Sequence, residues 1–248
     1  MNKNQILVHL HMPKTGGTSL KNIIKKNIDP HRNLDVYVEH EKRERIMRTI
    51  HSNQFDCIQG HFPYGIHKYI PCPFTYITML RDPIDRIVSE YYFIKNNKKH
   101  ELHHVVQHLS LEEYQNQPQN RNLQTRLISG HMSDPLTIAD VNKAKENIEK
   151  HFSVVGITEM FDESLLLMEK KFGWKNVKNR KQNATKKRPA LTSLSPKTLT
   201  LIKRNNNLDN ILYQFAKRDL LVKLKYLHSN SKTRVSTSPH KINKNRNG

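Results

Sequence analysis

QILVHLHMPKTGGTSLKNII, residues 5–24, is the stretch that decides which fold this sequence predicts. Its first part, QILVHL (5–10), is a short apolar run of the kind that forms a strand buried on both faces. After two adjacent glycines, Leu20, Ile23 and Ile24 recur at the spacing of one helix face. The chain therefore begins with a strand, a loop and a helix, an arrangement whose helix N-terminus is suited to holding a phosphate.

The same alternation of strand and helix continues along the chain. FTYITML (74–80) is β-branched and aromatic, as in a central parallel strand, and Asp82-Pro83 after it has the N-cap and N1 residues of a helix. FSVVGI (152–157) predicts another buried strand, and residues 161–173 an amphipathic helix closed by glycine. Two more helix starts follow toward the C-terminus, at Ser195-Pro196 and Asp209. The pattern predicts an α/β domain with a mostly parallel sheet.

The charge of the chain is concentrated in two segments. The 248 residues include 42 Lys+Arg and 22 Asp+Glu, a formal net charge of +20. Residues 170–190 hold nine basic and no acidic side chains, and residues 228–248 hold five and none. The second segment has Val235 and Ile242 as its aliphatic residues, which is too little apolar surface to offset the entropy of ordering. We therefore predict one domain over residues 1–227 and a basic, disordered tail over 228–248.

Bulk features exclude several classes of protein. Two cysteines, Cys57 and Cys72, cannot form a disulfide scaffold, and no run approaches the 18 apolar residues of a membrane span. The residues after Met1 lack the apolar core of a signal peptide. The sequence therefore favours a soluble protein in a reducing, cytoplasmic setting, without stable membrane insertion.

The loop HMPKTGGTSL (11–20) has the residue types that bind phosphate. Gly16 and Gly17 allow the backbone to approach a ligand closely, and Lys14 supplies a point charge. Three hydroxyl side chains lie beside them, on Thr15, Thr18 and Ser19. The loop is not a Walker A sequence, because its lysine precedes both glycines. It nevertheless predicts a P-loop-like anion site.

A second stretch, LRDPIDRIVSEYYF (80–93), offers another phosphate site at a strand-to-helix junction. Arg81 ends the strand and Ser89 lies about two turns into the helix, so a guanidinium and a hydroxyl can hold one phosphate from two sides. Arg86 is expected to form a structural ion pair with one of two nearby carboxylates, Asp82 or Asp85.

These two stretches carry a family resemblance. PKTGGTS (13–19) closely resembles the 5′-phosphosulfate loop of sulfotransferases that use 3′-phosphoadenosine 5′-phosphosulfate (PAPS), and residues 80–93 resemble their 3′-phosphate motif. The context is similar to the heparan sulfate 2-O-sulfotransferase group of carbohydrate sulfotransferases and its bacterial relatives, over roughly residues 5–225. The resemblance implies a three-layer α/β sandwich around a central parallel sheet.

The resemblance also implies the cofactor contacts. PAPS would be the co-substrate, without a metal, with residues 14–19 at its 5′ end and Arg81 and Ser89 at its 3′-phosphate. NATKKRP (183–189) resembles the C-terminal loop that closes over the nucleotide. Its basic side chains, Lys186, Lys187 and Arg188, would contact the 3′-phosphate end, although a simple solvated charged loop is the alternative.

A histidine is the expected base for the acceptor hydroxyl. His61 follows an apolar run, where the 2-O-sulfotransferase group carries a catalytic histidine, and His67 is the second candidate in that loop. That group has another histidine two residues earlier, and Gln59 stands there in this chain. Lys14 would stabilise the bridging oxygen of the departing nucleotide. Two further histidines near the loop are expected to serve packing, His9 and His11.

The acceptor and the competing functions stay open at this stage. The resemblance suggests a sugar hydroxyl, with a uronic-acid-containing glycan as the specific hypothesis, whereas a neutral glycan, a peptide tyrosine or a small metabolite are alternatives. A P-loop kinase is disfavoured by the missing Walker A sequence. A basic nucleic-acid-binding protein is disfavoured because no zinc finger, RNP motif or helix-turn-helix pattern is found, so no nucleic-acid partner is expected.

One competing motif is HELHH (100–104), which matches the H-E-x-x-H signature of zinc proteases. The preceding NNKK (96–99) interrupts a helix, and Gln107 stands where the metzincin continuation needs glycine. With 15 histidines in the chain, we interpret the match as coincidental and expect a polar surface segment.

Overall fold

The computed structural model describes residues 5–51, 54–175, 177 and 188–235. The predicted nucleotide contacts of Lys186 and Lys187 lie outside the described residues, as does the part of the predicted tail from residue 236 on.

A sheet of five parallel strands forms the centre of the molecule, in the order β2-β3-β1-β4-β5. The strands are β1 (Ile6–Leu10), β2 (Asn33–Asp35), β3 (Cys57–Gly60), β4 (Phe74–Leu80) and β5 (Phe152–Ile157). The strands predicted from the apolar runs at 5–10, 74–80 and 152–157 are confirmed. All five residues of β1 are buried, because this strand lies in the middle of the sheet with a partner on each side.

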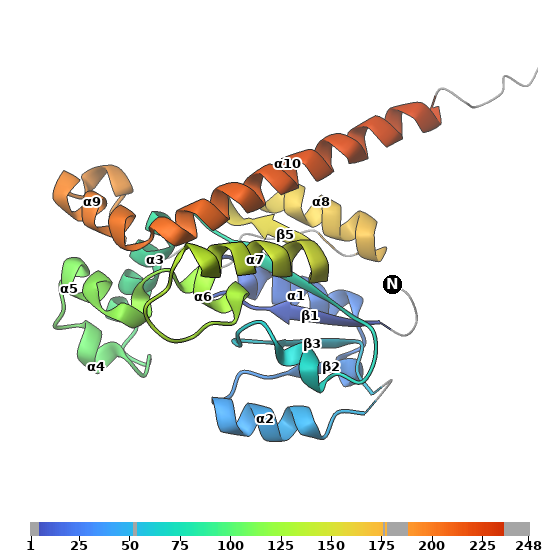
Figure 1. Ribbon diagram of the computed structural model, residues 1–248, viewed down its shortest axis with the longest axis horizontal. Coiled ribbons are helices and arrows are strands. Elements are labelled where there is room, and N and C mark those ends of the chain that lie inside the picture. Colours follow the sequence, from blue (N-terminus) through green and yellow to red (C-terminus); the bar gives the residue numbers. More distant parts are fainter. Residues whose placement is uncertain (1–4, 52–53, 176, 178–187, 236–248) are drawn as a thin grey trace, which may run out of the picture.

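Helices cover both faces of the sheet (Figure 1), so the predicted three-layer α/β sandwich is confirmed. Helices α6 and α7 lie on one face and α1 and α8 on the other, while α10 runs along β5 and beside α7. The helices are α1 (Gly17–Asn27), α2 (His40–Arg48), α3 (Pro83–Asn96), α4 (His103–Val106), α5 (Leu111–Asn116), α6 (Leu123–Ser129), α7 (Ile138–His151), α8 (Phe161–Phe172), α9 (Pro196–Asn205) and α10 (Asn207–Val235).

Most predicted helix ends are confirmed by their capping bonds. The Asp82 carboxylate accepts bonds from two backbone N–H groups in the first turn of α3, and the Ser195 hydroxyl accepts one in α9. Gly173 ends α8 in the left-handed conformation. The helix predicted to start at Asp209 is present and begins two residues earlier, at Asn207, and the buried Asp209 carboxylate accepts N–H bonds from the first turn of α6.

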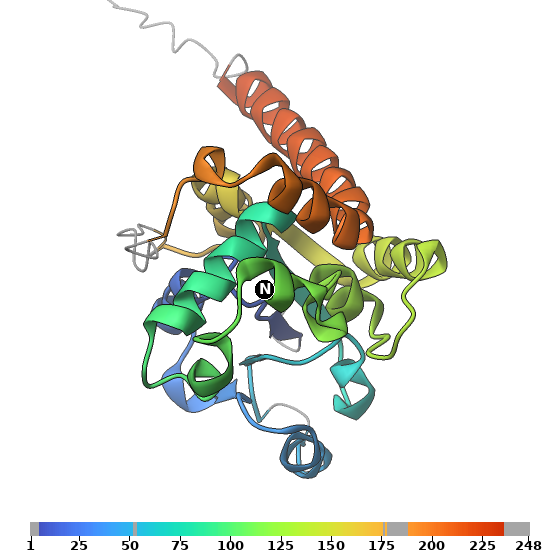
Figure 2. The ribbon, with the colours of Figure 1, turned by 90° about the vertical axis from the view of Figure 1, so that its left-hand side faces the viewer.

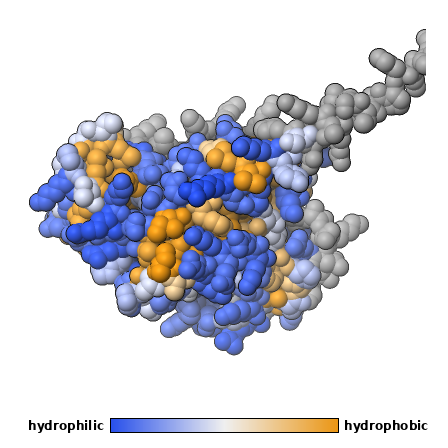
Figure 3. All heavy atoms as spheres, turned by 45° about the horizontal axis from the view of Figure 1, so that its top comes forward, coloured by the Kyte–Doolittle hydropathy of each residue, from blue (hydrophilic) through white to orange (hydrophobic). Residues whose placement is uncertain are grey.

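Helix α10 runs past residue 228, where the tail is predicted to begin, and continues to Val235. The division into a domain and a disordered tail stays a prediction. None of the helices in the described ranges is both long and apolar enough to cross a membrane. The face of the molecule drawn in Figure 3 is mainly hydrophilic, with separate apolar patches.

Beyond the carboxyl-terminal edge of the sheet, helices α3, α4, α5 and α9 pack on one another (Figures 1 and 2). They share a small core of their own, which includes Ile87, Val88, Tyr91, Tyr114 and Ile202. This group of helices stands beside the loops that follow β1, β3 and β4. Those loops carry the residues of the predicted site, as expected for an open parallel sheet.

Candidate active site

The loop between β1 and α1 is built for an anion. Gly16 adopts φ +81° just before the helix, and no side chain caps the first turn of α1 among the described residues. A β-carbon on Gly17 would lie 1.9 Å from Cδ2 of His11, so only glycine fits there. The N–H groups of the first turn are therefore left for a ligand, at the positive end of the helix dipole.

Lys14 sits at the tip of this loop in a strained conformation. Its φ is +64°, in the left-handed region that residues other than glycine rarely adopt, and its carbonyl oxygen accepts a bond of 2.9 Å from Nη1 of Arg81. Its ammonium group lies 3.8 Å from the centre of the Phe93 ring. Burial, followed by the nearby charge of Arg81, lowers the pKa of Lys14 to about 8.

The hydroxyl side chains of the loop are placed differently from one another. Thr15 is buried and its hydroxyl donates to the Met12 carbonyl, so that it shapes the loop. Thr18 is exposed and Ser19 is buried in the first turn of α1. Thr158, which follows β5, donates to the backbone carbonyl of Thr15 and ties the loop to the next strand end.

A carboxylate joins the two arginines predicted at the 3′-phosphate. Arg81 and Arg188 both donate to Asp85, Arg188 from a position more than 100 residues further along the chain. These hydrogen bonds, opposed by burial, hold the pKa of Asp85 below its ordinary value. Two guanidinium groups are thus gathered at the start of α3, next to the phosphate-binding loop. Ser89 lies two turns into the helix, with its side chain buried.

Arg86 forms an ion pair, but with a partner other than those predicted. Its Nη1 lies 2.8 Å from Oε2 of Glu90, one turn along α3, whereas Asp82 caps the helix and Asp85 binds the two arginines. The side chain of Arg86 is fully buried. The expected structural role is confirmed, and the expected partners were wrong because the (i, i+4) pair to Glu90 faces the interior.

His61 lies at the same edge of the sheet, directly after β3. Its ring contacts His11 edge-on with centroids 4.6 Å apart, and Tyr37 at 4.9 Å. His11 in turn packs against Gly17, so His11 joins the candidate base to the phosphate-binding loop. His61 is an exposed residue, yet desolvation by its packed neighbours and then the charge of Lys21 lower its pKa.

His9 and His11 serve packing and hydrogen bonding, as expected. His9 is fully buried and its Nδ1 lies 3.3 Å from Oε1 of Gln59, its register partner on β3. His11 Nδ1 lies 2.7 Å from the Tyr37 hydroxyl. Burial lowers the pKa of His9 to about 4 and that of His11 to about 2, so both stay neutral at physiological pH.

His67, the other candidate base, lies at the opposite edge of the sheet. Its ring stacks on Phe74 and its Nδ1 lies 3.0 Å from the Tyr76 hydroxyl, both near the start of β4. The chain must return to that edge before a parallel strand can begin. The structure therefore brings His61, and not His67, to the phosphate-binding loop.

Comparison with known proteins decides the family. The family model described as "Sulfotransferase family" matches residues 1–216. The chain belongs to the sulfotransferase family. Among curated proteins it is 24% identical to mouse heparan sulfate 2-O-sulfotransferase 1 over 66% of this chain and 54% of that protein. It is 24% identical to the Drosophila melanogaster heparin sulfate O-sulfotransferase over 85% of this chain and 70% of that protein.

Two further proteins are similar to this chain. Human heparan sulfate 2-O-sulfotransferase 1 is 22% identical over 67% of this chain and 54% of its own length, so the chain spans about half of the mouse and human relatives. A solved structure of mouse sulfotransferase SULT7A1 complexed with PAP is 14% identical, with a TM-score of 0.40, over 82% of this chain and 63% of that one.

Several residues of this candidate site could not be recognised from the sequence. Tyr37 follows the short edge strand β2, Lys21 lies on the second turn of α1, and Glu90 lies inside the motif of α3. The charge of Glu90 acts on both Lys14 and His61, where it partly opposes the lowering of the pKa that burial causes. Their roles depend on contacts across the sheet edge, which no local spacing reveals.

The zinc-protease signature at residues 100–104 does not form a zinc-binding helix. Helix α3 ends at Asn96, and α4 begins at His103, so His100 and His104 do not share one continuous helix. In the part of the chain that the structure describes, no group of His, Cys, Asp or Glu side chains is arranged to hold a metal ion.

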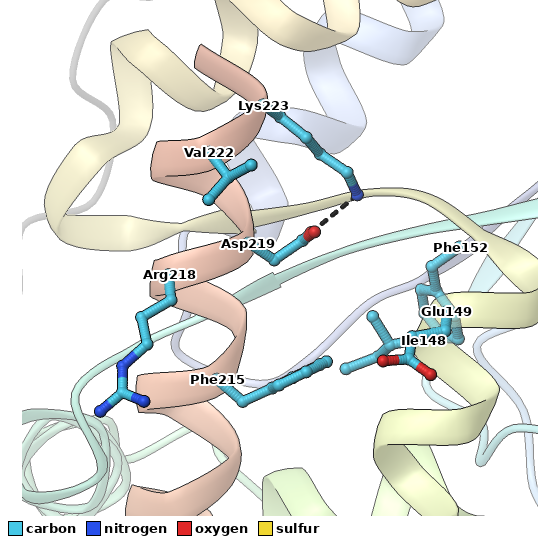
Figure 4. A pocket seen from close by; sticks show the side chains of 8 residues that line it. All are labelled: Ile148, Glu149, Phe152, Phe215, Arg218, Asp219, Val222 and Lys223. Atoms are coloured by element: carbon cyan, nitrogen blue, oxygen red, sulfur yellow. Dashed lines mark ion pairs between the residues drawn. The ribbon is translucent and has the colours of Figure 1, made fainter. Parts of the chain in front are cut away.

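A groove of about 400 Å³ lies elsewhere, between α7, α10 and the start of β5 (Figure 4). Phe215, Ile148 and Phe152 line it, and an ion pair between Asp219 and Lys223 stands on α10 beside it. Because Phe152 begins its strand, this groove is at the amino-terminal edge of the sheet. It is therefore separate from the loop that carries Lys14.

Proposed function

We propose that this protein transfers the sulfuryl group of PAPS to a hydroxyl group of a carbohydrate acceptor, with His61 as the base. The observation that carries the proposal is the meeting of two features at one edge of the sheet. An uncapped helix N-terminus with Lys14 lies in contact with His11, and His11 contacts His61. An anion site thus adjoins a neutral imidazole, as transfer to a hydroxyl requires.

The nucleotide would be held at both ends by residues of this chain. The backbone N–H groups after Gly16, together with Lys14, suit the 5′-phosphosulfate. Arg81 and Arg188, already gathered by Asp85, suit the 3′-phosphate. Membership of the sulfotransferase family supports PAPS as the co-substrate, and PAP is the nucleotide that would remain after transfer.

Each group has a defined part in the reaction. His61 removes the proton of the acceptor hydroxyl, and the acceptor oxygen forms a bond to sulfur. The bond between sulfur and the bridging phosphate oxygen breaks, and the electron pair stays on that oxygen. Lys14 stabilises the charge that develops there, and transfer in line places the two oxygens on opposite sides of sulfur. His61 then releases its proton to solvent.

An anionic acceptor is favoured by Arg43 on α2. Its Nη1 lies 3.5 Å from the backbone oxygen of His61, and its side chain is half-buried. Within the described residues no carboxylate forms an ion pair with it, and its neighbour Glu44 bonds to Tyr69 instead. A guanidinium beside the base without a counterion suits a carboxylate or sulfate on the acceptor. This supports a uronic-acid-containing glycan as acceptor, and two curated relatives are named as a heparan sulfate 2-O-sulfotransferase and a heparin sulfate O-sulfotransferase.

Transfer of labelled sulfate from PAPS to a panel of glycans tests the proposal. We expect transfer to uronic-acid-containing glycans that continues in EDTA, and loss of at least 100-fold in Lys14→Ala. No transfer to any hydroxyl acceptor, or phosphate transfer from ATP that depends on Mg²⁺, would overturn it and favour a kinase.

A further inference from the structure

Two lysines on α1 share one carboxylate but differ in a second contact. Lys21 and Lys25, one turn apart, lie 2.9 and 3.0 Å from Oδ2 of Asp35. The ammonium group of Lys21 also lies 3.8 Å from the centre of the Tyr37 ring. The described contacts include no such interaction for Lys25. Lys21 therefore joins α1 to the segment after β2, over the face of an aromatic ring.

Tyr37 links Lys21 to His61. The edge-to-face contact of its ring with His61 has an interplanar angle of 82°. Its hydroxyl is hydrogen-bonded to His11, and His11 touches His61 from the other strand. The His61 ring thus rests against two rings that are themselves fixed. None of the hydrogen bonds described in the structure holds the His61 ring, so these ring contacts set its position.

We propose that Lys21 is a positioning residue for His61: its ammonium group holds the Tyr37 ring, which in turn holds the imidazole beside the phosphosulfate-binding loop. This inference rests on the proposed role of His61 as base. Lys21 itself touches neither the acceptor nor the nucleotide in this scheme. Asp35 keeps the ammonium group in place, and the face of Tyr37 attracts it.

The charges around His61 determine what the pH profile should show. They come from every neighbouring element: Lys21 on α1, Asp35 on β2, Arg43 on α2 and Glu90 on α3, with the neutral His9 on β1 and the neutral His11 directly after it. After desolvation, Lys21 is the main cause that lowers the pKa of His61, and Glu90 opposes it. Removal of the Lys21 charge must therefore raise the pKa of the base, so that less of it is neutral at a given acidic pH.

The test compares the pH dependence of kcat/KM for sulfate transfer in Lys21→Met and in the matched control Lys25→Met. We expect Lys21→Met to lose about tenfold in kcat, as for a misplaced catalytic group, and to move its acidic limb to higher pH. Lys25→Met should keep the wild-type profile. Lys21→Arg should restore the rate, because a guanidinium also stacks on a tyrosine ring. Tyr37→Leu should lose rate as Lys21→Met does.

Three results would overturn the inference: a wild-type profile in Lys21→Met, equal effects of the two methionine variants, or no rescue by arginine. Circular dichroism of each variant reports a loss of fold, and its PAP affinity reports a loss of the nucleotide site. A variant that keeps both but transfers slowly has a misplaced base. Failure of the proposed function looks different, because the wild type would then transfer no sulfate to any hydroxyl acceptor. Failure of His61 as the base would leave His61→Ala with the wild-type rate whatever Lys21 does.

Discussion

At the scale of single residues, Lys14 is unfavourable in two ways, through its backbone conformation and through the burial of its charged group. It occupies the left-handed backbone region, and its ammonium group is partly buried near Arg81. Backbone strain of this kind is about 1–3 kcal/mol and persists where neighbouring structure fixes it. Here the fixing contact is the bond from Arg81 to the Lys14 carbonyl. This bond keeps the strained lysine close to Arg81, the residue proposed to bind the other end of the nucleotide.

The pKa of Lys14, about 8, predicts how nucleotide binding depends on pH. The charged form of Lys14 attracts the phosphosulfate, and this form predominates below pH 8 and is lost as the pH rises through 8. We therefore expect the affinity for PAP to fall between pH 7 and pH 9.5, as measured by calorimetry. Lys14→Arg, which stays charged, should show a flatter dependence. Equal pH dependence in the two proteins would contradict this role.

Arg43 gives a prediction about acceptor choice. With Arg43→Ala, the KM for a glycan that carries uronic acid should rise about tenfold or more, because a charge-assisted hydrogen bond is lost. The KM for the same glycan after reduction of its carboxyl groups should stay as in the wild type. Arg45→Ala, on the exposed side of α2, is the matched control. A similar rise in KM for both acceptors would show that Arg43 does not bind the carboxyl group of the uronic acid.

At this scale, local patterns in the sequence sufficed to bring the candidate residues together. Arg81 and His61 directly follow strands and Lys14 lies in the loop after β1, so their shared edge could be expected. The roles of Tyr37 and Lys21 could not be predicted from the sequence, because they need contacts that form only when β2 and α1 are in place. The sequence also left open whether His61 or His67 is the candidate base, and only the structure shows which of them lies beside the loop that carries Lys14.

At the scale of elements, two helix N-termini cap each other. The Asp209 carboxylate accepts N–H bonds from Gln124 and Thr125 at the start of α6. In return, Oδ1 of Asn122 accepts bonds from Leu208 and Asp209 at the start of α10. Helix α6 carries part of one layer, and α10 runs along β5. This exchange therefore fixes the long C-terminal helix to the domain.

Loss of Asp209 should destabilise the protein strongly. Asp209→Ala leaves two buried N–H groups without acceptors and removes a negative charge near the buried Arg86. We expect a loss of about 3 kcal/mol in the free energy of unfolding, measured by urea denaturation. Ser110→Ala removes the exposed cap of α5 and should cost about 1 kcal/mol. Equal losses in the two variants would contradict the reciprocal cap.

The elements also show where sequence patterns mislead. Ser195-Pro196 and Asp82-Pro83 cap their own helices, so a local pattern sufficed. Asp209 has the same appearance, an acidic residue before an apolar run, yet its partners lie more than 80 residues earlier. Likewise, Arg86 had several carboxylates within one turn, and burial of one helix face selected Glu90.

At the scale of the whole molecule, the net charge of +20 first suggests a polyanion partner. The described part assigns some of this charge to a compact anion site, where Arg81, Arg188 and Lys14 meet at the edge of the sheet. Arg188 joins the C-terminal half of the chain to α3 through Asp85. The cytoplasmic setting, the tail from residue 236 and the contacts of Lys186 and Lys187 stay predictions.

Because PAP would bind the folded state at contacts from both halves of the chain, it should stabilise the whole domain. At a PAP concentration 100 times the Kd of PAP, the free energy of unfolding should rise by about 2.7 kcal/mol. For a domain of this size, that corresponds to a rise in Tm of roughly 5–10 °C, measured by thermal scanning. Arg81→Ala should show a much smaller rise at the same PAP concentration. The absence of any shift at saturating PAP would exclude the nucleotide site described for this edge.

The central claim is that His61 and the phosphate-binding loop form one site for sulfuryl transfer. A single-turnover measurement tests it most directly, with labelled PAPS bound to the enzyme before a glycan acceptor is added. If His61 is the base, His61→Ala binds PAP as the wild type does and transfers the label at least 100-fold more slowly. Transfer by His61→Ala at the wild-type rate, with the nucleotide equally bound, would contradict the account.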